Sequence, residues 1–114
     1  MDRSKAKKDY KQTRQPMGVF RIRNTRNGNS YVGSSTNLRA GINRQKSELK
    51  FGSHRNAALL REWKSFGESA FEFEVLDELP FDENSSANPE EELRILAEMW
   101  IRKLEDGGGI VVVL

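Results

Sequence analysis

The chain has 114 residues, no cysteine, 19 Lys and Arg, 17 Asp and Glu, and a formal net charge of +2 at pH 7. This length suits one domain with a modest core, and the lack of cysteine excludes disulfide bonds and thiolate metal sites and favours a cytoplasmic or other intracellular location. No apolar run approaches ~18 residues, so we expect neither a transmembrane span nor a secretory signal, and no membrane partner.

The charges divide unevenly along the chain. Residues 1–66 carry 16 Lys and Arg against 4 Asp and Glu (+12), whereas residues 67–114 carry 3 against 13 (−10). A basic first half is typical of a phosphate-binding surface. The alternative is an internally compensating charge pattern that keeps the protein in solution.

The first sixteen residues contain six Lys and Arg, two Asp and almost no apolar side chain. Such a segment cannot bury enough surface to offset its ordering entropy, so residues 1–16 are predicted to form a basic mobile arm. The arm either adds salt-dependent affinity for a nucleic-acid backbone or is only a solvated tail. Pro16 ends it, because proline restricts the preceding residue to extended conformations.

A hairpin followed by a helix is predicted next. Apolar and polar residues alternate over residues 18–23, and a second short strand covers residues 31–33. Between them, Asn27-Gly28 is a strong hairpin signal, because both central residues of a type I′ turn need positive φ. Residues 34–37 are all Ser, Thr or Asn and supply N-cap oxygens for a helix that begins near Leu38.

Three helices are predicted from apolar residues at helical spacing, over residues 37–51, 56–66 and 90–104. Gly52 and Gly67 are natural stops for the first two helices. Asn88-Pro89 supplies a capping residue and a first-turn proline for the third.

Between the second and third helices, apolar and acidic side chains alternate over residues 70–76. This pattern predicts a strand with Phe71, Phe73 and Val75 facing the core. Glu72 and Glu74 then face solvent, and no catalytic role is expected for them.

After the third helix, three glycines lead into an apolar C-terminal tail, residues 107–114. The tail must pack as a strand or a plug, because left free it would promote aggregation. Residues 17–106, between the arm and the tail, are expected to form the folded domain.

The order of these segments resembles the GIY-YIG nuclease superfamily, in particular its homing-endonuclease members. The resemblance begins with Gly18-Val19-Phe20, Tyr31-Val32-Gly33 and Ser34-Ser35-x-Asn37-Leu38, and continues through residues 49–54, 59–67, 70–76 and 98–101. It implies an α/β fold, α+β by stricter usage. The expected domain has a small, mainly antiparallel three-stranded sheet and three helices in the order β-β-α-α-β-α.

The resemblance also implies hydrolysis of DNA phosphodiesters with one divalent cation. A helix-three carboxylate would hold the cation, a helix-one arginine would stabilise charge on the phosphate, and a hairpin tyrosine would position water. Position by position, Tyr31 and His54 are the retained catalytic candidates. The substituted positions are Phe20 for a tyrosine, Gly41 for the arginine, Gln45 for a histidine and Ala97 for the metal-binding glutamate.

Two neighbouring side chains are candidates to replace the missing groups. Glu98 is turned ~100° around its helix from Ala97, so its carboxylate should point away from the site. Arg44 lies ~60° from the face of Gly41, and its long side chain can lean toward the site. A register shift that brings Glu98 into the site would move Trp100 off the core.

The function expected from the sequence is therefore DNA binding by a divergent domain whose nuclease activity is lost or strongly impaired. The predicted DNA-binding residues are Arg39, Arg44, Lys46, Lys50 and Arg55. No metal site and no cofactor are expected.

Two alternatives stay open, namely an active endonuclease that depends on Mg²⁺ or Mn²⁺, and a scaffold without ligand whose cleft is filled by the apolar tail. Tyr31 either contacts ligand or packs a sheet edge, and His54 either contacts phosphate or caps the second helix. The oligomeric state is open, and no disulfide partner is expected.

Overall fold

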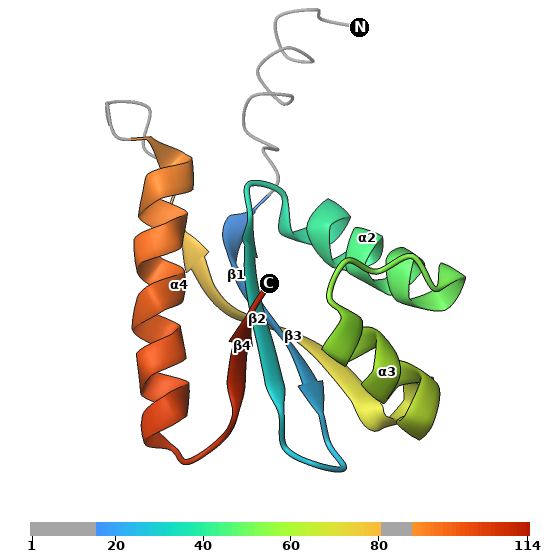
Figure 1. Cartoon of the computed structure of the whole chain (residues 1–114). Coiled ribbons are helices and arrows are strands. Elements are labelled where there is room, and N and C mark those ends of the chain that lie inside the picture. Colours follow the sequence, from blue (N-terminus) through green and yellow to red (C-terminus); the bar gives the residue numbers. More distant parts are fainter. Residues whose placement is uncertain (1–15, 81–87) are drawn as a thin grey trace, which may run out of the picture.

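The structure is a computed structural model that describes residues 16–80 and 88–114. Its elements are β1 (Met17–Asn24), β2 (Ser30–Ser35), α2 (Leu38–Phe51), α3 (Ala57–Phe66), the 3-10 turn η1 (Glu68–Ala70), β3 (Phe71–Leu79), α4 (Pro89–Asp106) and β4 (Val111–Val113) (Figure 1). The predicted α+β class is confirmed, as is the order of elements through α4. Apart from Pro16, the predicted basic arm lies outside the described residues, as do residues 81–87 between β3 and α4.

The sheet has four strands in the order β3-β1-β2-β4, rather than the three expected. β1 is antiparallel to both β2 and β3, whereas β4 is parallel to β2. The fourth strand is the apolar tail, and backbone bonds from Ser30 N–H to Ile110 O and from Leu114 N–H to Val32 O hold its two ends. The tail was expected to pack as a strand or a plug, but parallel pairing has no local turn signal that predicts it.

The hairpin turn forms at Asn27-Gly28, but the predicted type I′ geometry is wrong, because Asn27 does not have positive φ and the connection between β1 and β2 spans residues 25–29. Gly28 has φ 79°, a conformation that side-chain-bearing residues rarely adopt. Backbone bonds from Asn24 N–H to Asn29 O and from Gly28 N–H to Asn24 O close the turn. The register that follows pairs Phe20 with Gly33, so the phenyl ring lies over a residue without a side chain.

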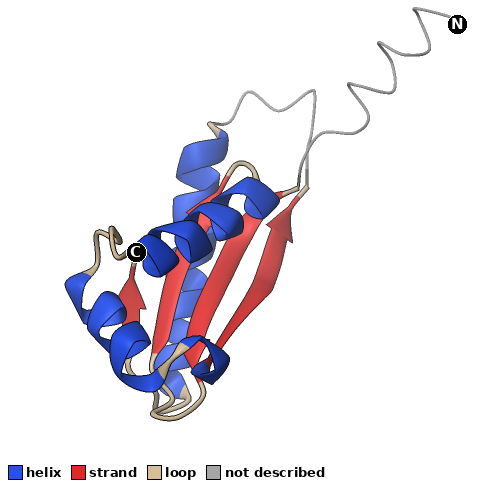
Figure 2. Cartoon of the chain, turned by 90° about the vertical axis from the view of Figure 1, so that its right-hand side faces the viewer, coloured by secondary structure: helices blue, strands red, loops and turns tan. Residues whose placement is uncertain are grey.

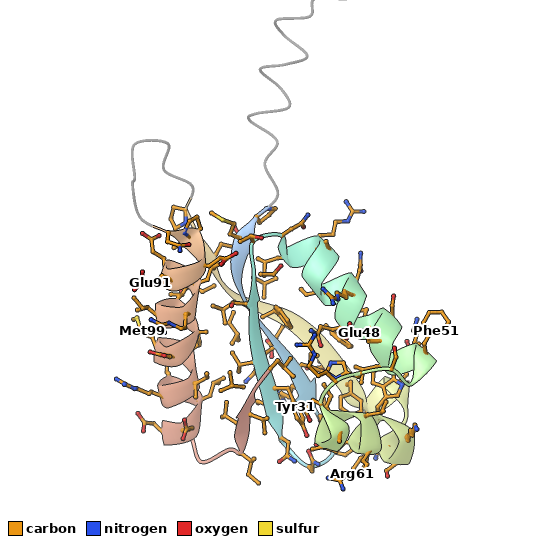
Figure 3. The ribbon with its side chains drawn as sticks, turned by 45° about the horizontal axis from the view of Figure 1, so that its top comes forward. Tyr31, Glu48, Phe51, Arg61, Glu91 and Met99 are labelled. Carbon is orange, nitrogen blue, oxygen red and sulfur yellow. The ribbon has the colours of Figure 1, made fainter. Side chains whose placement is uncertain are left out.

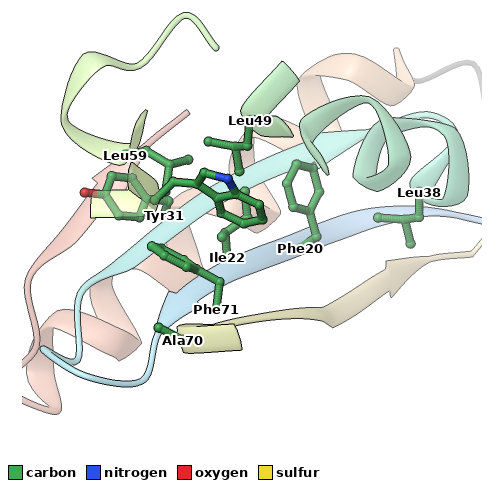
Figure 4. Packing of buried hydrophobic residues seen from close by; sticks show 9 residues of the cluster. Phe20, Ile22, Tyr31, Leu38, Leu49, Leu59, Ala70 and Phe71 are labelled. Carbon is green, nitrogen blue, oxygen red and sulfur yellow. The ribbon is translucent and has the colours of Figure 1, made fainter. Parts of the chain in front are cut away.

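The helices cover the two faces of the sheet separately. α2 and α3 lie on one face and α4 on the other (Figure 2). On the first face, the buried side chains include Phe20, Ile22, Tyr31, Leu38, Leu49 and Leu59 (Figure 4). On the second face, Val19 and Val32 pack with Ala97 of α4. Strand alternation explains the division, because neighbouring residues of a strand point to opposite faces.

One expectation about β3 is wrong. Phe71 is buried and Phe73 packs against the same cluster, as predicted, but Val75 is 47% exposed. Val75 pairs with Phe20 and so lies on the predicted face, but β3 is at the edge of the sheet, where its burial is incomplete. The next residue, Leu76, is left unpaired by a shift in register and packs on the α4 side. Strand order decides which strand is at the edge, so alternation within β3 alone does not predict this exposure.

No helix among residues 16–80 and 88–114 has both the length and the apolar character needed to cross a membrane.

The outer side of α4 carries charged residues, and Glu91 and Met99 point away from the sheet there (Figure 3).

Candidate functional site

The main candidate site is a pocket of about 410 Å³, which we call the α2 pocket. It is formed by α2, the α2–α3 loop, Phe20 of β1, the end of β2, and the end of β4 with Leu114 after it. Four positions that the family resemblance singles out line it together, namely Phe20, Gly41, Gln45 and His54. Gly41 and Gln45 are one helical turn apart, whereas Phe20 and His54 come from other segments and are brought to them by the fold.

His54 is 8% exposed and both of its ring nitrogens have partners. Nδ1 accepts a bond of 3.0 Å from the Asn56 backbone N–H, which leaves the ring proton on Nε2 for donation to Gln45 Oε1. Desolvation by burial lowers the pKa of His54, more than nearby Glu48 raises it. His54 is therefore neutral near pH 7 and orders the loop before α3, with neither ring nitrogen available to a ligand.

Two side-chain amides are held so that they offer donors. The oxygen of Gln45 is engaged by His54, and the Asn56 Oδ1 accepts a bond of 3.0 Å from the Leu59 N–H at the start of α3. Both residues line the α2 pocket. Because each amide oxygen has an internal partner, the NH₂ group of each side chain remains for a ligand.

Gly41 fits closely against Ser35. A Cβ atom at position 41 would lie 2.7 Å from the Ser35 Oγ. That hydroxyl is fixed, because it donates to Asn37 O at 2.7 Å and accepts from Asn37 N–H at 3.0 Å. Any side chain at position 41, arginine included, would have to displace Ser35.

Ala97 lies apart from the α2 pocket, on the other face of the sheet. It is 9% exposed and packs with Val19 and Val32. A second hollow, of about 330 Å³, is lined by residues 34–36 and by Glu90 and Leu93 of α4. Residues 34 and 35 border both hollows, so the two hollows meet at the end of β2.

The residues present do not fit the divalent-metal site that the family resemblance implies. Ala97 has no ligand atom, and Glu98 is exposed and lines neither hollow. Glu90 borders the second hollow, seven residues before Ala97 and thus on the same side of α4. In the described part of the chain, no three His, Cys, Asp or Glu side chains gather as metal ligands.

Tyr31 belongs to the core instead of the pocket. It is 1% exposed, does not line the α2 pocket, and its hydroxyl points away from Phe20 (Figure 4). The hydroxyl donates to Glu62 Oε2 of α3. Tyr31 therefore joins β2 to α3, and its hydroxyl is already bonded.

Glu62 is a residue that sequence reasoning missed. Its Oε1 accepts bonds from the side-chain amides of Asn24 (2.9 Å), Asn27 (2.6 Å) and Asn29 (3.4 Å), in addition to the Tyr31 bond at Oε2. One carboxylate thus fixes the whole hairpin turn to α3. The sequence did contain one signal for Glu62, because it is one of only 4 acidic side chains in residues 1–66.

The five predicted DNA-binding residues divide into two groups. Arg44 and Arg55 line the α2 pocket, and Arg44 Nε bonds Glu48 at 3.0 Å. The other three, Arg39, Lys46 and Lys50, are spaced by seven and four residues and share the opposite flank of α2.

Two members of the flank group, Lys46 and Lys50, have partners elsewhere. Lys46 Nζ lies 5.0 Å from the centroid of the Phe73 ring, and Lys50 pairs with Glu68 at 3.4 Å. Only Arg44 and Arg55, therefore, are placed to contact a ligand inside the α2 pocket.

The chain is similar to one curated protein. The chain is 29% identical over 87 residues to intron-associated endonuclease 1 of Enterobacteria phage T4, covering 76% of this chain and 32% of that protein. The chain thus spans about a third of the length of this curated relative. No family model matches the chain.

Two solved structures resemble the fold. The catalytic domain of the homing endonuclease I-TevI has a TM-score of 0.66 and 26% identity, over 84% of this chain and 97% of that one. A mutant form of the catalytic domain of intron endonuclease I-TevI has a TM-score of 0.65 and 27% identity, over 80% and 86%. The chain is therefore a GIY-YIG-like domain, and it is similar in particular to the catalytic domain of I-TevI.

Proposed function

We propose that this domain binds DNA and that its nuclease activity is lost or strongly impaired. The relatives are endonucleases of the intron and homing types, for which DNA is the expected substrate. The basic first half of the chain, with Arg44 and Arg55 at the α2 pocket, supports contact with a phosphate backbone.

The observation that carries the loss of activity is the packing at two positions. Gly41 and Ala97 stand where the family resemblance implies an arginine and a metal-binding glutamate. Gly41 is closed in by Ser35, and Ala97 packs among aliphatic side chains. Catalytic groups that act as a unit leave little rate when even one is removed, and here two are absent.

The neighbouring side chains support the same proposal. To replace the missing metal-binding glutamate, Glu98 would have to point from α4 toward the sheet. It is instead exposed and lines neither hollow. Arg44 does line the α2 pocket, but its Nε is engaged by Glu48. We therefore expect DNA binding without a metal cofactor, in an intracellular setting.

A salt titration of duplex DNA binding tests the first half of the proposal. Fluorescence anisotropy with a labelled duplex, in EDTA, should give an affinity that falls linearly with salt on logarithmic axes, with a slope near −0.9 per neutralised phosphate. Arg55→Gln should lower that slope by about one phosphate. No measurable affinity at low salt would favour the ligand-free scaffold.

Plasmid nicking tests the second half. With Mg²⁺ or Mn²⁺ the protein should nick no more than it does with EDTA. Metal-dependent nicking that Glu98→Ala abolishes would instead establish the active endonuclease, with Glu98 as the replacement ligand. Glu105→Ala, a change of the same charge near the end of α4, is the matched control.

A further inference from the structure

We propose, building on the proposed DNA binding, that the α2 pocket takes one unpaired nucleotide, with its base inside and its phosphate at the rim. The volume of about 410 Å³ falls within the roughly 300–1,000 Å³ of pockets that enclose small-molecule ligands. A paired duplex is too wide to enter such a space and can touch only its rim. A single extruded or overhanging nucleotide is the part of DNA that fits.

The amides of Gln45 and Asn56 define which part of the nucleotide enters. Each side chain has its oxygen bonded inside the protein and its NH₂ group left for a ligand. Two such donors suit the carbonyl and ring-nitrogen acceptors on the edge of a base. Thymine, with acceptors at O2 and O4, is a base of this kind.

The pocket also has an apolar part. Phe20 of β1 and Leu114, the residue after β4, line it together. Leu114 is only partly buried and packs on the same side of the sheet as Phe20, so it can contact a ligand there. Contact with an apolar surface does not stabilise a bound phosphate group, whereas the flat face of a base packs favourably against such a surface.

The arginines stand at the rim. Arg55 is exposed, and the Arg44 side chain is 71% exposed. The bond to Glu48 uses the Arg44 Nε and leaves its terminal nitrogens for a phosphate. Charge at the rim and uncharged donors inside are the arrangement expected for a nucleotide whose base enters first.

Three duplex probes in EDTA test this proposal. They share one duplex and carry a short thymidine overhang, an abasic overhang of equal length, or a blunt end. The thymidine overhang should bind about fivefold or more tightly than the abasic one, because base contacts of this kind are worth about that much. Equal affinity for the two overhangs would overturn the proposal.

Asn56→Asp is the decisive variant. The new carboxylate still caps α3 but replaces the NH₂ donor with an oxygen that repels the acceptors of the base, so the preference for thymidine over abasic overhang should fall from about fivefold to about twofold or less, with Gln45 and the apolar contact remaining. Arg102→Gln, the same charge change on exposed α4, should leave the preference intact. An unchanged preference in Asn56→Asp would overturn the proposal.

A failure of the proposed DNA binding would give a different result from a failure of the nucleotide pocket. If none of the three probes binds at low salt, both DNA binding and the nucleotide pocket are wrong. If all three bind equally, the domain binds DNA through its backbone alone and only the pocket proposal fails.

Discussion

A Cβ atom on Gly41 would lie 2.8 Å from the Cβ of Ser35, a separation that real side chains essentially never show. Ser35 cannot easily withdraw, because its hydroxyl bonds both the N–H and the carbonyl of Asn37, the N-cap of α2. The start of α2 is therefore built around the absence of a side chain at position 41.

Gly41→Ala should lower stability although it lies inside a helix. In an open helix this change stabilises by about 1 kcal/mol, whereas overpacking costs about 1–3 kcal/mol. In a Ser35→Gly background the crowding is gone, and the same change should become stabilising. Denaturant unfolding of the four proteins of this cycle measures both values. A stabilising effect in both backgrounds would show that the crowding is not real.

Restoring the missing groups should restore metal-dependent nicking. The combination Ser35→Gly, Gly41→Arg and Ala97→Glu reinstates the arginine and the carboxylate and removes the obstruction. Gly41→Arg or Ala97→Glu alone should stay inactive, because such groups act as a unit. Plasmid nicking in Mn²⁺ against EDTA is the measurement, with duplex binding as the check on folding. An inactive combination would mean that further positions, such as Phe20, limit the chemistry.

The pKa of His54 predicts how stability depends on pH. Burial lowers this pKa from its ordinary value of 6.5, so the unfolded chain binds a proton more readily than the folded one. Stability from neutral His54 is thus fully present above 6.5 and is lost as pH falls toward the lowered value. The free energy of unfolding should be level above about pH 6.5 and should fall as the pH decreases below it.

His54→Gln is the control, since His54 is the sole histidine. The free energy of unfolding of this variant should change less over the same range. An equal pH dependence in both proteins would contradict the buried, neutral ring.

Glu62 and Tyr31 should matter for stability and not for DNA binding. Glu62→Gln weakens four hydrogen bonds and should cost about 1–3 kcal/mol. Tyr31→Phe removes one of them and should cost about 1 kcal/mol, and the two changes together should be non-additive. Thermal unfolding and duplex anisotropy give the two readouts. Weaker DNA binding by Tyr31→Phe without loss of stability would instead identify Tyr31 as a ligand contact.

Local features were the most predictable from the sequence. The predicted capping residues Asn37 and Asn88 each accept a backbone bond at a helix start, whereas the second of the three helices is capped by Asn56 and not by His54. Asn27-Gly28 forms the hairpin turn. These signals depend on residues within a few positions of each other, so one chain is enough to read them.

Long-range relationships were not predictable. Three features join segments that a sequence pattern treats separately. They are the parallel pairing of β4 with β2, the hydrogen bond between His54 and Gln45, and the hydrogen bond from Tyr31 to Glu62. The family resemblance indicated positions 20, 41, 45 and 54 for the site, and the structure brings them to one pocket. The family resemblance gave no sign that His54 already has partners at both ring nitrogens, because hydrogen-bond partners depend on the neighbouring loop.

The hydrogen bonds that Glu62 accepts from the hairpin also affect how a ligand binds. Because β1 and β2 are tied to α3, the floor of the α2 pocket has little freedom left to lose. Association should then proceed without an ordering step, and its rate should follow the ionic strength as a simple electrostatic encounter does.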